Sequence, residues 1–149
     1  MKTCFFIGHR DAPDSLRPLL DEAVESHIIE YGVADFVVGK YGSFDRMVAQ
    51  ALYKAKQQHP HIRLTMLLAY YEPNKSINLP PGFEDSLYPD ELENVPKRYA
   101  IVRANQYMVR HSEYLIAYDK GIVGNTRELV QYARRREELI HIENLAEKM

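Results

Sequence analysis

The chain is poor in cysteine and has no large excess of charge of either sign. Cys4 is its single cysteine, so neither an internal disulfide nor a zinc site built from several thiolates can form. Cys4 falls in the first apolar run, and we interpret it as a core thiol rather than a nucleophile. The formal net charge of −2 leaves no global basic field to attract nucleic acid or an anionic membrane.

Long apolar runs are absent as well. No run approaches the ~18–20 residues of a membrane-spanning helix, and the start of the chain lacks the pattern of a secretory leader. We therefore expect a cytoplasmic protein. With 149 residues, 46% of them hydrophobic, the chain is long enough for one globular domain with a single core.

Short apolar runs alternate with segments of helical periodicity along the chain. We expect strands near residues 3–7, 35–38, 63–69, 114–118 and 139–142, with helices between most of them. This alternation predicts an α/β fold, with a single doubly wound domain over residues 1–149 and a mostly parallel five-stranded sheet covered by helices on both faces. The first strand should be central, between the second strand and the strand at residues 114–118.

Residues 72–97 interrupt this pattern. Five of the eight prolines lie in this stretch, and no regular periodicity connects its aromatic residues. A stretch of this length without secondary structure is uncommon inside a compact domain. We expect a lid or binding loop here, and an inert insertion is the alternative.

Three turns that follow strands contain glycine, at residue 8, residues 39–42 and residues 121–124. In a parallel sheet such turns open on one edge, where backbone N–H groups and helix N-termini face a common space. Arg10 offers a planar cation suited to a phosphate or carboxylate, and a plain turn with a surface arginine is the alternative. None of the turns is a Gly-x-Gly-x-x-Gly fingerprint or a Walker P-loop, which argues against ordinary dinucleotide dehydrogenases and nucleoside triphosphatases.

Several polar residues have both a structural and a chemical interpretation. Ser43 is expected to cap the second helix, and Asn125 with Glu128 has the spacing of a capping box. Asp45 suits the positive end of a helix dipole. Asn105 lies on an otherwise apolar helical face, so it should either form an internal hydrogen bond or face a cleft.

Two further features are expected to be structural. His27 lies on the apolar stripe of the first helix, which favours a satisfied, half-buried histidine over a metal ligand. The arginines at 134–136 fall in the last turn of a helix, where cations complement the dipole, and a nucleic-acid patch is the alternative. We expect no metal site and no required cofactor.

Four motifs follow one another along the chain: residues 5–10 (Phe-Phe-Ile-Gly-His-Arg), 38–45 (Val-Gly-Lys-Tyr-Gly-Ser-Phe-Asp), 105–109 (Asn-Gln-Tyr-Met-Val) and 111–118 (His-Ser-Glu-Tyr-Leu-Ile-Ala-Tyr). In this order they resemble the YpsA-like branch of the SLOG superfamily, the Rossmann-like group that includes the LOG phosphoribohydrolases and the DprA DNA-processing proteins. The likeness spans about residues 3–142 and matches residues 72–97 poorly. It implies a Rossmann-like fold that binds nucleotides or nucleotide-derived ligands, and some members hydrolyse the bond between base and ribose phosphate.

The resemblance also implies ligand-facing roles for the three turns. They are Gly8, His9 and Arg10 in the first turn, Gly39, Gly42, Phe44 and Asp45 in the second, and Gly124, Asn125 and Thr126 in the third. The third turn resembles a Gly-Gly-Thr phosphate turn in which Asn125 replaces the second glycine. Leu129 stands where the LOG hydrolases have a catalytic glutamate, and Glu128 is one residue earlier.

These observations leave three functions open. The first is binding of a small phosphorylated, nucleotide-like ligand by a sensor or weakly catalytic protein, through Gly8, His9, Arg10, Gly39, Tyr41, Gly42, Ser43, Phe44, Asn105, Gly124, Asn125 and Thr126. The second is a LOG-like phosphoribohydrolase in which Asp45 and Glu128 are the carboxylates and His9 carries the proton. The third is DprA-like single-stranded nucleic-acid binding, against which the net charge argues. We expect a small-molecule nucleotide derivative as the partner, no membrane, and a possible homodimer.

Overall fold

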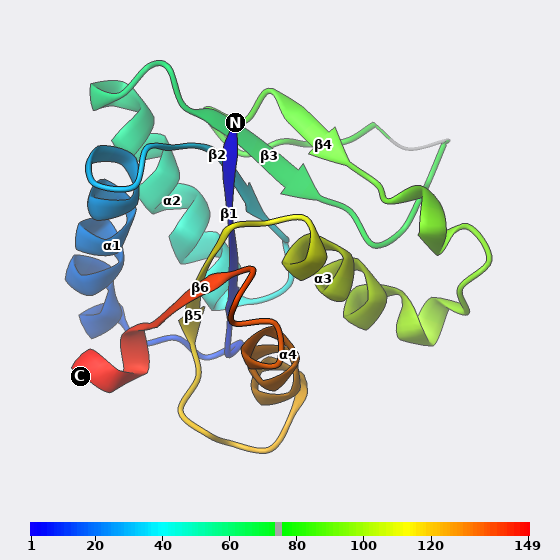
Figure 1. Ribbon diagram of the computed structural model, residues 1–149. Helices are drawn as coiled ribbons and strands as arrows, with labels where there is room; N and C mark the ends of the chain where they lie inside the picture. Colours follow the sequence, from blue (N-terminus) through cyan, green and yellow to red (C-terminus); the bar gives the residue numbers. More distant parts are fainter. Residues whose placement is uncertain (74–75) are drawn as a thin grey trace.

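The computed structural model describes residues 1–73 and 76–149. Within these residues, six strands form one parallel sheet in the order β4-β3-β2-β1-β5-β6. The strands are β1 (Lys2–Gly8), β2 (Val33–Val38), β3 (Arg63–Leu67), β4 (Asp85–Leu87), β5 (Tyr114–Tyr118) and β6 (His141–Asn144). The central position of β1 between β2 and β5 confirms the predicted order (Figure 1).

Helices cover both faces of this sheet. Figure 1 shows α1 (Arg17–Ile29) and α2 (Ser43–Gln58) on one face, and α3 (Ala100–Arg110) and α4 (Asn125–Arg134) on the other. The predicted α/β class with a parallel sheet is therefore confirmed. None of the helices in the described residues is both long enough and apolar enough to cross a membrane.

The core has two halves, one on each side of the sheet. Along β1, Cys4 and Phe6 pack with α1 and α2, whereas Phe5 packs with α3 and α4. Residues of β5 alternate in the same way, with Ile116 on the first side and Leu115 on the second. Because both faces are covered, each central strand contains a short apolar run, such as residues 4–7 of β1 and 36–38 of β2, and these runs made the strands recognisable in the sequence.

The edges of the sheet differ from the prediction. The predicted sheet had five strands, and the sixth, β4, lies inside residues 72–97 at the edge next to β3. Phe83 and Leu92 of the same stretch are buried in the two halves of the core. β6 begins at His141 rather than at Leu139, whose side chain is 68% exposed. Residues 74–75 of the expected lid lie outside the described residues.

Two buried side chains of the core were also singled out in the sequence. Cys4 is completely buried, as predicted, and burial raises the pKa of its thiol. His27 is also completely buried rather than half-buried, and its Nδ1 lies 2.7 Å from the carbonyl oxygen of Ala23. Its Nε2 has no hydrogen-bond partner among the described residues. Only one of the two ring nitrogens of His27 is therefore hydrogen-bonded, whereas the sequence predicted a fully hydrogen-bonded histidine. Burial lowers the pKa of His27.

Candidate functional site

A cleft of about 320 Å³ opens at the carboxyl ends of β1, β2 and β5. It brings together residues of the three glycine turns and two residues of α3, Ile101 and Asn105. The predicted site residues in its wall are Gly8, His9, Arg10, Gly39, Tyr41, Asp45, Asn105, Gly124, Asn125 and Thr126. The convergence expected from the sequence therefore occurs at one edge of the sheet, as the parallel topology requires.

Two features of the cleft favour an anion. Arg10 is exposed and forms no ion pair within the part of the chain that the structure describes. Across the cleft, α4 begins at Asn125 after Gly124, which has a φ of +152°. The first amides of a helix lack partners within that helix and carry a partial positive charge. A phosphate between Arg10 and these amides would meet donors from both sides.

Asp45 is the acidic group of the cleft. It lies in the first turn of α2, and its Oδ2 accepts a 2.9 Å hydrogen bond from the backbone N–H of Tyr41. Burial raises the pKa of this carboxyl from 3.8 to about 6, and the Tyr41 hydrogen bond offsets part of this shift. Asp45 therefore exchanges its proton close to neutral pH, which suits it to proton transfer or to donating a hydrogen bond.

His9 connects the first glycine turn to the third. Its Nε2 accepts a 2.9 Å hydrogen bond from the backbone N–H of Lys120, and its ring meets the ring of Tyr118 edge to face. Asp119 Oδ1 is also 4.0 Å from this nitrogen. The shorter contact requires an unprotonated Nε2, so we assign the neutral tautomer with the proton on Nδ1. In this arrangement His9 positions the loop after β5, and its Nε2 is not free to serve as a proton carrier.

Phe44 does not face the cleft. Its ring is 1% exposed and stacks on Tyr118 at a centroid distance of 6.2 Å. A Cβ atom at residue 8 would lie only 2.4 Å from this ring, so Gly8 is required by the core packing of Phe44. The expectation that Phe44 contacts a ligand is therefore not supported by its position, because the ring is enclosed by β1, α2 and β5.

Ser43 and Gly42 connect the first two turns instead of lining the cleft. The predicted N-cap, Ser43, is the first residue of α2, and Gly42 occupies the N-cap position. The hydroxyl of Ser43 donates to the carbonyl of Arg10 and accepts from the N–H of Ala12. A Cβ at residue 42 would lie 3.1 Å from Cα of Arg10, and φ there is +124°, so this close approach needs glycine.

The predicted capping box at the start of α4 does not form. Gly124 occupies the N-cap, Asn125 is the first helical residue, and no side chain of the described residues caps this end. Glu128 is exposed and lines a neighbouring hollow of about 290 Å³ between α3 and α4 rather than the cleft itself. Asn105 and Asn125 line both spaces. Asn105 therefore faces a cleft, which is one of the two environments that the sequence predicted for it.

The sequence analysis missed the apolar part of the wall. Ile122 and Val123 line the cleft, although 54% and 83% of their respective surfaces are exposed. They lie between Gly121 and Gly124, both of which have positive φ. Two aliphatic residues between two glycines, directly after a strand, were the signal in the sequence that could have identified them.

Comparison with known proteins adds no family assignment. A scan of protein-family models and a search of curated proteins found no match to this chain. Within residues 1–73 and 76–149, no group of three or more histidine, cysteine, aspartate or glutamate side chains is arranged to hold a metal ion. The function must therefore be argued from the cleft itself.

Proposed function

We propose that the cleft binds a small phosphorylated, nucleotide-like ligand at the carboxyl edge of the sheet. The observation that carries the proposal is the position of Arg10, which has no ion pair among the described residues, in the same cleft wall as the amino end of α4. A phosphate is the group that such donors bind best, because backbone amides and a guanidinium both supply directed N–H groups. The ordered motifs that resemble the YpsA-like branch of the SLOG superfamily support the same ligand class.

The remainder of the wall suits the rest of a nucleotide. Tyr41 and Ile101 offer apolar surface, and Asn105 offers an amide that can both donate and accept hydrogen bonds. A volume of about 320 Å³ lies at the lower end of the range for small-molecule sites. The proposed ligand is therefore a mononucleotide or a compound of similar size.

Calorimetric titration with AMP tests this proposal. We expect Arg10→Ala to weaken binding by about 1–3 kcal/mol, the range for a hydrogen bond to a charged group. Arg134→Ala is the matched control, because Arg134 is also exposed but lies in the last turn of α4, at its far end from Gly124. Equal affinity of the wild type and the Arg10 variant would assign Arg10 a role in the fold alone.

A second candidate function is hydrolysis of the bond between base and ribose phosphate. The position of Asp45 favours this reaction. Of the two proposed catalytic carboxylates, Asp45 is the one that lines the cleft, and its pKa is about 6. A protonated Asp45 would donate a proton to the departing base, and the ionised form would stabilise positive charge on the sugar. We expect a hydrolase to release free base from AMP and to lose this activity in Asp45→Asn. Absence of base release leaves binding as the function.

A further inference from the structure

A second hollow lies between α2 and the connection from β3 to β4. Within the residues that the structure describes, this connection contains no helix. The connections before and after β2 place α1 and α2 on one face of the sheet. A right-handed connection from β3 to β4 runs over the same face. Gly82 of this connection lies beside Leu64 and Tyr53, which confirms its course. The space next to α2 that a crossover helix would fill is therefore open.

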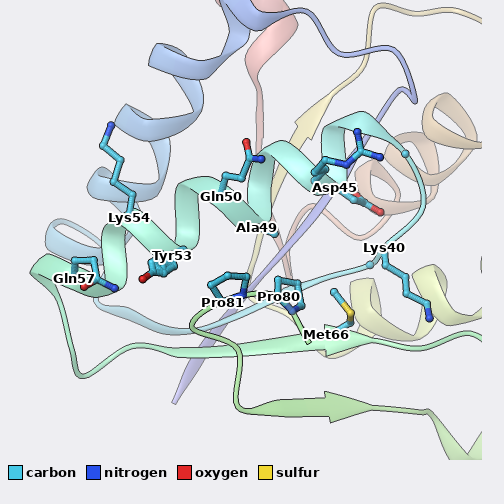
Figure 2. A pocket seen from close by; sticks show the side chains of 13 residues that line it. Lys40, Asp45, Ala49, Gln50, Tyr53, Lys54, Gln57, Met66, Pro80 and Pro81 are labelled. Carbon is cyan, nitrogen blue, oxygen red and sulfur yellow. The ribbon is translucent and has the colours of Figure 1, made fainter. Parts of the chain in front are cut away.

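This hollow is a groove of about 680 Å³ with apolar walls (Figure 2). One wall is α2, where Ala49 and Tyr53 are four residues apart and so lie on one side of the helix. Pro80 and Pro81 of the β3–β4 connection form the opposite wall, and Met66 of β3 lies at the base. The ring of Tyr53 and the two proline rings offer flat apolar surfaces.

One end of the groove is positively charged. Lys40 and Arg46 line it near the start of α2, and neither forms an ion pair with any described residue. Asp45 is the only acidic residue of the lining, and Lys54 is paired with Asp21 on α1. At the opposite end, Gln57 lies near this paired Lys54 (Figure 2). The groove thus combines a cationic end with a long apolar body.

We propose that this groove binds a small aromatic anion, with its anionic group at the end lined by Lys40 and Arg46 and its flat body between Tyr53 and the two prolines. The volume falls within the range of sites for small organic ligands. Lys40 and Arg46 are exposed and form no ion pair with a described residue, so this end favours a carboxylate, sulfonate or phosphate over a neutral group. The groove shares Gly39 and Asp45 with the cleft and otherwise has a different lining, so it is a separate site next to the proposed nucleotide site.

Anilinonaphthalene sulfonate is a suitable probe, because it joins a flat aromatic body to one sulfonate and its fluorescence increases in apolar surroundings. We expect saturable binding to the folded wild-type protein. The double variant Lys40→Ala/Arg46→Ala should weaken binding at least about tenfold. Ala49→Phe, which fills the groove, should abolish binding, whereas the control Arg134→Ala should leave it unchanged. AMP affinity should be unaffected by Ala49→Phe, which separates this test from that of the cleft.

The location of the probe is tested on the wild-type protein, so that the result does not depend on folding of the variants. Backbone amide signals in NMR spectra should shift on addition of the sulfonate at Ala49, Gln50 and Tyr53 of α2. Absence of saturable binding would overturn the proposal. Shifts confined to residues outside the groove, or unchanged binding by the double variant, would overturn it equally.

Discussion

Replacement of the half-buried acid Asp45 by asparagine should stabilise the protein, and the gain should depend on pH. The folded-state pKa of Asp45 is about 6, above its ordinary value of 3.8, so folding disfavours the ionised form. The folded state then binds more protons than the unfolded state between these two values. The contribution of Asp45 to the free energy of unfolding is therefore fully present below about pH 4 and is lost as pH rises through about 6.

The magnitude follows from the size of the shift. Each pKa unit corresponds to about 1.4 kcal/mol, so ionised Asp45 costs up to about 3 kcal/mol above pH 6. Asparagine has the same shape, and its Oδ1 can still accept the hydrogen bond from the N–H of Tyr41. We therefore expect Asp45→Asn to raise the free energy of unfolding by about 2–3 kcal/mol near pH 8 and by little near pH 4.

Urea denaturation of both proteins across this pH range measures the difference. Asp14→Asn is the control, because the side chain of Asp14 is 91% exposed and makes only a surface ion pair with Arg17. Its effect on the free energy of unfolding should be small. A destabilised Asp45 variant, or one whose gain is the same at pH 4 and pH 8, would refute the assignment of Asp45 as an acid whose pKa is raised in the folded state.

Three further predictions concern the walls of the cleft and the long connection. Gly8→Ala should destabilise the protein by more than about 1 kcal/mol in thermal or urea unfolding, because its Cβ would overlap the Phe44 ring; a neutral effect would contradict the packing. His9→Ala should accelerate hydrogen exchange at Lys120, whose N–H loses its acceptor, and unchanged protection would argue against this contact. Phe83→Ala should cost about 3–5 kcal/mol in urea unfolding, whereas a loss below about 1 kcal/mol would show that Phe83 lies outside the core.

The central strands were predictable because burial on both faces gives each of them a short apolar run, such as residues 4–7 of β1 and 115–117 of β5. β4 was not predictable in the same way, since it has only three residues and two of them are Asp85 and Ser86. Its pairing with β3 depends on the path of the connection, which local sequence does not determine. Phe83 of the same stretch is apolar but isolated, so periodicity could not show that it is buried.

The positions of the three turns were also predictable, but the roles of single residues within them were less so. Ser43 and Asn125 are good N-cap residues by type, yet each follows a glycine with positive φ that takes the N-cap position instead. The burial of Phe44 depends on contacts with Tyr118, seventy-four positions away in the sequence. The raised pKa of Asp45 results from packing around its carboxyl, and composition alone cannot predict this.

The central claim, that the cleft binds a phosphorylated nucleotide-like ligand, is tested most directly by NMR spectra recorded while AMP is added. We predict saturable shifts of the backbone amide signals of Gly8, Arg10 and Thr126, which line the cleft. The signal of Gln57, at the far end of the groove beside α2, should stay unchanged. Absence of saturable shifts, or shifts that avoid the turns after β1 and β5, would contradict the claim.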